Sequence, residues 1–258
     1  MTDVPIVQQN KRLNFAWIPE MLFHPKRCFQ RFASLSNPLW LTPLLILSFA
    51  VCINVFLVGR IKSQAALMGE IAYPPDFQYY TPEQQAQYTQ AIQSTQGPVF
   101  TYVLPIFVAL SGVWIGWLFL GGLLHLVTTL FGGRGSIGLS MNIVAWASLP
   151  LAVREFVQII YLFFTKKLIS NPGLSGFSLV GDSGLPLYFS QILTLIDIYL
   201  VWQIILLILG VRISTGLNST KSFFSVLLTF LIIILIQSGL SYLESALGNL
   251  NIARPFFF

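Results

Sequence analysis

The chain has 258 residues, of which 55% are hydrophobic and 9% are charged. A soluble domain carries roughly 25% charged residues, so this composition excludes most soluble folds. The net charge is +5, but the basic residues lie at the ends of apolar blocks and form no run or face, which argues against nucleic acid as a partner. These apolar blocks have the length of a bilayer-crossing helix. We therefore predict an all-α polytopic membrane helical bundle with about five transmembrane helices.

Residues 1–38 are polar to amphipathic and are predicted to form a cytoplasmic N-terminal segment. Within it, apolar residues between Phe15 and Phe32 are interspersed with three cationic residues: Lys26, Arg27 and Arg31. This pattern is typical of a short amphipathic helix in the membrane interface, with aromatic side chains in lipid and cations near anionic headgroups. The alternative is a helix packed on the bundle. Membrane lipids are the first partner that the sequence implies.

A transmembrane domain is predicted over residues 39–245, followed by a tail over 246–258. Its five spans are expected at about 39–58, 99–131, 137–164, 187–211 and 223–243. The first should end at Gly59-Arg60, and the second is longer than one crossing needs. Pro150 should kink the third span.

The loop over 59–98 is the longest segment outside the spans. Thr81 is followed by proline and, three residues on, by Gln84, a pattern that predicts a helix beginning with a capping box. This helix should be exposed, either as a solvated connector or as a docking surface for another protein. Eight Lys and Arg residues outside the spans lie on the N-terminal side of the membrane and five on the other, which predicts a cytoplasmic N-terminus and an outside C-terminus.

No HExxH helix, glycine-rich phosphate loop or GxSxG elbow is present, and two histidines are too few for a histidine-rich metal site. We expect no enzyme, no metal site and no cofactor. Cys28 precedes the first span and Cys52 lies inside it, so both should be free thiols.

Charged residues inside spans are costly and usually face a partner, water or a functional site. Arg154 and Glu155 lie in the third span and Asp197 lies in the fourth, and rise per residue places Arg154 and Asp197 at a similar depth. We predict that Asp197 pairs with Arg154, with Glu155 as a third member or turned toward the headgroups. This polar pair is either a structural tie between spans or part of a proton or ion path.

Three stretches, over residues 23–47, 131–150 and 195–228, together resemble the Yip family of Ypt/Rab-GTPase-interacting proteins, and specifically its prokaryotic branch. The positions that carry the resemblance most specifically are Gly132, Gly133, Pro150, Asp197, Trp202 and Gly210. The resemblance implies five spans with a cytoplasmic N-terminus and a non-enzymatic role. Glycine, proline and tryptophan positions in this set are then structural determinants of the bundle.

Eukaryotic members resemble trafficking factors that bind Rab GTPases through a long N-terminal region, which this chain lacks, so Rab binding is not expected. The prokaryotic resemblance implies a bacterial plasma-membrane protein, with relatives that are accessory partners of ABC-type exporters. The sequence therefore predicts an assembly, scaffolding or accessory partner in a membrane transport or trafficking complex. The alternative is a small transporter or channel whose polar path includes Asp197, Arg154 and Glu155.

Overall fold

The structure is a computed structural model that describes residues 13–33, 39–67, 77–95, 97–177 and 184–246. The start of the predicted N-terminal segment and nearly all of the C-terminal tail lie outside the described residues. Within those described, the chain forms helices and no strand. Five helical segments are long and apolar enough to cross a membrane, which confirms the predicted fold class: Leu41–Ala65, Val99–Leu130, Ile137–Thr165, Ile198–Thr215 and Ser219–Gly239.

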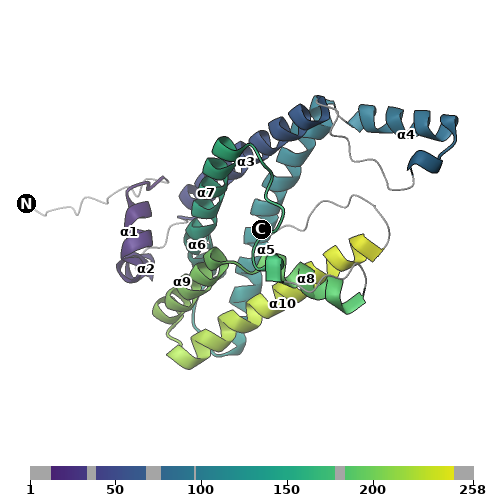
Figure 1. The fold of residues 1–258 in the computed structure, drawn as a ribbon. Helices are drawn as coiled ribbons and strands as arrows, with labels where there is room; N and C mark the ends of the chain where they lie inside the picture. The colour runs from purple at the N-terminus through teal and green to yellow at the C-terminus, as the bar shows by residue number, and fades with distance from the viewer. Residues whose placement is uncertain (1–12, 34–38, 68–76, 96, 178–183, 247–258) are drawn as a thin grey trace, which may run out of the picture.

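Figure 1 shows the helices in chain order. Two short helices come first and the spans follow, the second of which begins with a π-helical turn over Val99–Val103. The α-helices are α1 (Trp17–Phe23), α2 (Pro25–Ala33), α3 (Leu41–Leu67), α4 (Pro82–Thr95), α5 (Leu104–Leu130), α6 (Ile137–Ala147), α7 (Leu149–Thr165), α8 (Gly184–Leu195), α9 (Ile198–Thr215) and α10 (Ser219–Ala246).

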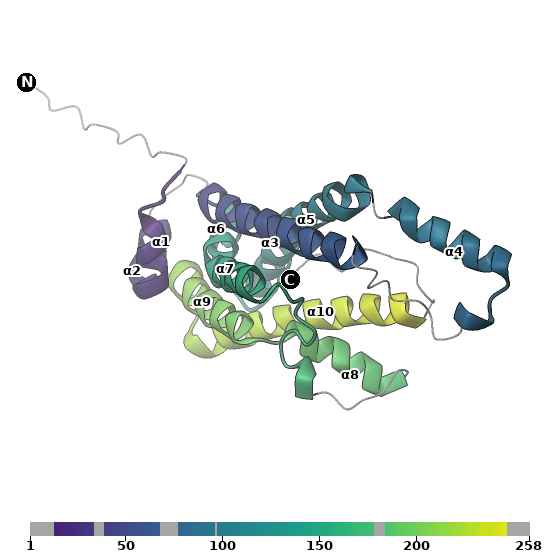
Figure 2. The ribbon, with the colours of Figure 1, turned by 45° about the horizontal axis from the view of Figure 1, so that its top comes forward.

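Helix α9 is central to the packing and contacts α2, α6, α7 and α10, while α3 packs against α5 and α7 (Figure 2). The largest fully buried side chain is Trp146, whose indole donates to the Leu39 carbonyl at 3.0 Å. The Leu39 amide in turn donates to Asn142 Oδ1 at 2.9 Å. The turns over 131–136 and 216–218 lie at the same end of the bundle, because the Arg134 amide donates to the Thr215 carbonyl at 2.9 Å. We call this the short-loop end.

The segment before the spans forms two helices rather than one. Pro25 follows His24, and a residue before proline is disfavoured in helical conformation, so α1 ends there and α2 begins with proline at its first position. Met21, Cys28 and Phe29 are fully buried against the bundle. This segment therefore packs on the bundle through one face, and its position in the membrane interface stays a prediction.

The first span is longer than predicted. Helix α3 does not end at Gly59-Arg60 but continues to Leu67. Gly59 is a site of close packing rather than a helix end, since its α-carbon faces the carbonyl of Thr101 and the ring of Tyr102. The Phe56 and Tyr102 rings pack on each other nearby, with centroids 5.4 Å apart.

The third predicted span is divided at Ser148, next to Pro150. Proline has no N–H and cannot continue the hydrogen-bond ladder of α6, so α7 starts as a new helix with Pro150 in its first turn. The Ser148 hydroxyl donates to the Val144 carbonyl at 2.8 Å and accepts from Gln203 Nε2 of α9 at 3.2 Å. The kink is thus held by a neighbouring helix.

The fourth predicted span, over 187–211, is wrong as one helix. The chain breaks after Leu195, and Asp197 adopts an extended conformation as the N-cap of α9. Its Oδ1 accepts from the Leu200 amide at 2.7 Å. An aspartate side chain competes with the helical backbone and is favoured at the positive end of a helix. Apolar residues on both sides of Asp197 hid this break from a reading of hydropathy.

Candidate functional site

The charged residues of the predicted polar pair lie together where α7 meets the start of α9. Arg154 Nη1 is 3.4 Å from Asp197 Oδ2, and Arg154 Nη2 is 3.1 Å from Glu155 Oε1. The side chains of Arg154, Glu155 and Asp197 are 13%, 10% and 17% exposed. Glu155 therefore takes part in the cluster and does not turn away from it.

A helix that the prediction left out completes the cluster. Asn54 of α3 donates through Nδ2 to Glu155 Oε2 at 2.6 Å and to Gln158 Oε1 at 2.8 Å. Asn54 is 8% exposed. The polar cluster, which consists of Asn54, Arg154, Glu155, Gln158 and Asp197, thus connects α3, α7 and α9. The desolvation cost of buried charges offsets much of their attraction, but removing one partner is costly because it leaves the other charge uncompensated.

Sequence reasoning missed Asn54 and Gln158, although a signal existed. Each is a polar residue within an otherwise apolar span, and such residues need a partner in the bundle interior. Gln203, which bonds Ser148 at the kink, belongs to the same class. Looking for amides as well as charges inside spans would have found all three.

Two of the family-pattern glycines end α5. Gly132 has φ of +87°, a left-handed conformation that glycine adopts without steric penalty. Its amide donates to the Thr129 carbonyl, and the Gly133 amide donates to the Thr128 carbonyl, both at 2.9 Å. These two bonds form a Schellman motif, which terminates the helix and turns the chain toward α6.

Gly210 has a different structural reason, which is the close approach of α2 to α9. A β-carbon at Gly210 would lie 2.9 Å from Phe29 Cε1 and 2.7 Å from Ile143 Cγ2. Trp202 is partly buried and packs against the main core, and Pro150 is buried at the kink. The glycine, proline and tryptophan positions of the pattern therefore serve turns and packing at separate places, and Asp197 is the pattern residue that belongs to the polar cluster.

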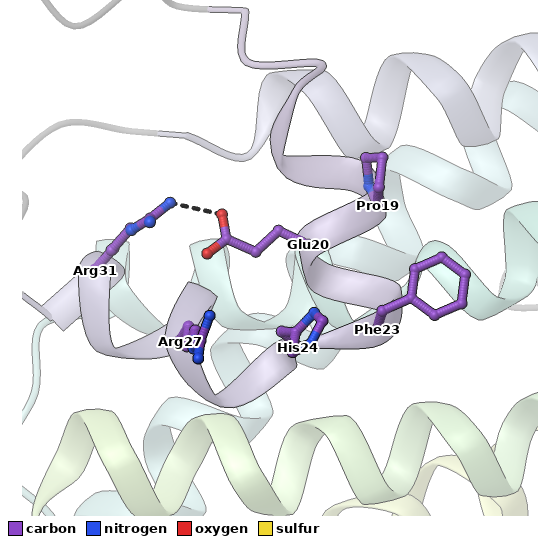
Figure 3. Close-up of a pocket in the computed structure, with 6 residues that line it drawn as sticks. All are labelled: Pro19, Glu20, Phe23, His24, Arg27 and Arg31. Atoms are coloured by element: carbon purple, nitrogen blue, oxygen red, sulfur yellow. Dashed lines mark hydrogen bonds and ion pairs between the residues drawn. The ribbon is translucent and has the colours of Figure 1, made fainter.

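The predicted interfacial cations are divided by the structure. Lys26, Arg27 and Arg31 are all exposed, but only Arg27 and Arg31 line a pocket between α1 and α2 (Figure 3). Arg31 Nη1 is 2.6 Å from Glu20 Oε2, an ion pair that links the two helices. Behind the pocket, burial and the nearby Glu20 carboxylate raise the pKa of the Cys28 thiol to about 12, opposed by Arg31.

These features define a polytopic helical membrane protein with a charged cluster tying three spans and two short helices packed beside them. The Yip1 domain family model matches residues 20–240 of the chain, which includes every span. The chain therefore belongs to the Yip1 domain family, and the family resemblance inferred from sequence is confirmed. No curated protein and no solved structure was found to match it.

Proposed function

We propose that this chain is a non-enzymatic protein of a bacterial plasma membrane that acts as an assembly or accessory partner of a membrane complex. The observation that supports this role best is that the polar cluster joins α3, α7 and the start of α9. Arg154 is bonded to both carboxylates, and Asn54 is bonded to Glu155 and Gln158. In this role the charges hold spans together, and binding to partners takes place elsewhere on the molecule.

Helix α4 is the surface that we propose for a partner. It extends away from the spans in both views (Figures 1 and 2). Its exposed residues include Gln84, Gln87 and Gln90. The helix has no continuous apolar stripe that is buried against the spans. Phe77 lies 5.7 Å from Tyr80 and 5.5 Å from Tyr88 between ring centroids, a small aromatic cluster that holds the base of α4 in shape. An ABC-type exporter is the partner that the family resemblance suggests, and α4 would contact a part of it that lies outside the membrane.

The test is affinity recovery of the tagged chain after mild detergent solubilisation, with quantitative mass spectrometry of what comes with it. We expect a reproducible partner that is lost with Gln87→Arg on α4. Gln30→Arg places the same substitution at an exposed position of α2 and should keep the partner. Recovery of the chain alone, in repeated preparations, would contradict the assembly role.

A small transporter or channel is the second candidate, and the break between α8 and α9 favours it. Discontinuous helices in transporters place charged residues and helix ends at ion sites. Asp197 is both the cap of α9 and a partner of Arg154. Proton or potassium flux into liposomes should then fall with Asp197→Asn. Absence of flux through the parent protein would exclude this candidate.

A further inference from the structure

The pocket between α1 and α2 has a volume of about 490 Å³. Its lining consists of Pro19, Glu20, Phe23, His24, Arg27 and Arg31 (Figure 3). The pocket is a depression that is widely open to the outside, so a ligand in it would keep part of its surface exposed. It is separate from the polar cluster, which lies at the opposite end of α9.

Cationic groups of the pocket come from one face of the chain around α2. Arg27 and Arg31 are four residues apart on α2, so their side chains project toward the same side, and His24 lies at the junction of α1 and α2. One carboxylate, Glu20, is present among the lining residues, and it is bonded to Arg31. The described lining residues thus bring two guanidinium groups against one carboxylate. This charge suits an anionic ligand, and planar guanidinium groups suit phosphate.

Helix α2 packs near the short-loop ends of α6 and α9. Phe29 of α2 lies against Gly210, five residues before the end of α9, and Ile143, six residues after the start of α6, borders Gly210 as well. At 1.5 Å per residue these contacts are about 8–9 Å from the short-loop end of each span. An interfacial helix lies about 5–10 Å into the boundary between headgroups and acyl chains. With the short-loop ends of the spans taken as the membrane surface, α2 lies within this interfacial depth.

An apolar edge accompanies the charges. Phe23 lines the pocket and is 77% exposed, and Phe15, just before α1, is 55% exposed. Exposed phenylalanines are unfavourable in water but are favourable against acyl chains. A soluble phosphate would use only the cationic half of this pocket. A phospholipid would use both halves.

We propose that this pocket is a binding site for an anionic phospholipid of the surrounding membrane. The lipid phosphate contacts Arg27 and Arg31, with His24 beside it, and the start of an acyl chain lies along Phe23. Glu20 keeps Arg31 at the junction of the two helices. Lys26 is exposed on α2 but does not line the pocket, so it contributes only to the general surface potential.

Native mass spectrometry of the full chain in neutral detergent tests this site, by titration with phosphatidylglycerol and with phosphatidylcholine. We expect preferential binding of phosphatidylglycerol and a loss of about tenfold or more in its affinity with Arg27→Gln. Lys26→Gln removes the same charge one residue away and should change the affinity by less than about twofold. Arg27 forms no ion pair with any of the described residues, so its substitution breaks no salt bridge among them. Circular dichroism of each variant shows whether the fold is kept.

Equal losses with Lys26→Gln and Arg27→Gln would overturn the site, because they would mean that charge alone attracts the lipid. Equal binding of phosphatidylcholine would overturn it as well. Competition with soluble glycerol phosphate separates the two possible sources of phosphate. Displacement of the lipid at equal concentration of glycerol phosphate would mean a soluble ligand and would also contradict the proposal.

Discussion

Gly210 lies where α2 and α6 approach α9 closely. Its substitution by alanine places a β-carbon within 3.0 Å of both Phe29 and Ile143, so α2 must shift or detach. Overpacking of this kind destabilises by roughly 1–3 kcal/mol. We expect Gly210→Ala to lower the melting temperature in detergent. Gly122→Ala is the matched control, because nothing lies within 4 Å of the added β-carbon, and it should leave the melting temperature unchanged or slightly raised.

Cys28 reports whether α2 is docked. Its pKa is raised from 9.0 to about 12, so the folded chain keeps a thiol proton that the unfolded chain releases between these values. The buried thiol therefore makes its full contribution to the stability of docked α2 below about pH 9. This contribution decreases as the pH rises toward 12. In a Cys52→Ala background, modification of Cys28 by iodoacetamide at pH 8 should be slower than that of an exposed thiol by roughly a hundredfold or more.

Rapid modification of Cys28 at pH 8 in the folded protein would contradict the buried position. Combination with Gly210→Ala provides an internal comparison. If that substitution detaches α2, the thiol becomes exposed and its reaction should accelerate. The rate of Cys28 modification thus reports directly on whether Gly210→Ala detaches α2.

The start of helix α9 depends on Asp197 in two ways. Asp197 caps the helix through Leu200 and pairs with Arg154, at distances of 2.7 Å and 3.4 Å. Asparagine caps a helix about as well as aspartate, whereas alanine does not, and the difference is about 1 kcal/mol. We expect Asp197→Asn to lose the ion pair alone and Asp197→Ala to lose both. Thermal unfolding in detergent should therefore rank the parent first, Asp197→Asn second and Asp197→Ala last.

Arg154→Met tests the same element from the other side. It removes the guanidinium from both carboxylates while keeping an unbranched side chain, and it leaves Glu155 and Asp197 without their cation. Removing one partner of a buried pair is costly, at about 3–5 kcal/mol. Stability equal to that of the parent would mean that the polar cluster does not hold α7 to α9.

For the whole molecule, the distribution of Lys and Arg predicts that α2 and α4 face opposite sides of the membrane. Cysteines introduced at Lys26 and at Gln87, both exposed, report on this when the native cysteines are replaced by alanine. A membrane-impermeant maleimide added to intact cells should label Gln87→Cys only. After the membrane is opened, Lys26→Cys should be labelled as well. Labelling of Lys26→Cys in intact cells would mean that the orientation is opposite to the predicted one.

Hydropathy over about twenty residues was sufficient for the count of spans, because bilayer thickness sets their length whatever the packing. Local rules also placed the start of α4. The Thr81 amide donates to Gln84 Oε1 at 2.9 Å, and the Gln84 amide donates to Thr81 Oγ1 at 3.3 Å, which is the reciprocal capping box that the spacing predicts. The kink at Pro150 follows from the missing proline N–H. Each of these rests on residues close together in the chain.

The sequence by itself therefore determined a five-span helical membrane protein of the Yip1 domain family. Only the tertiary structure decided where α3 ends, that Asp197 divides a predicted span, and that Asn54 joins Arg154 and Glu155. It also decided that Arg27 and Arg31 face a pocket while Lys26 does not. Asn54 and Glu155 are 101 positions apart. Contacts between such distant residues depend on how helices pack in three dimensions, and periodicity within one segment has no information about them.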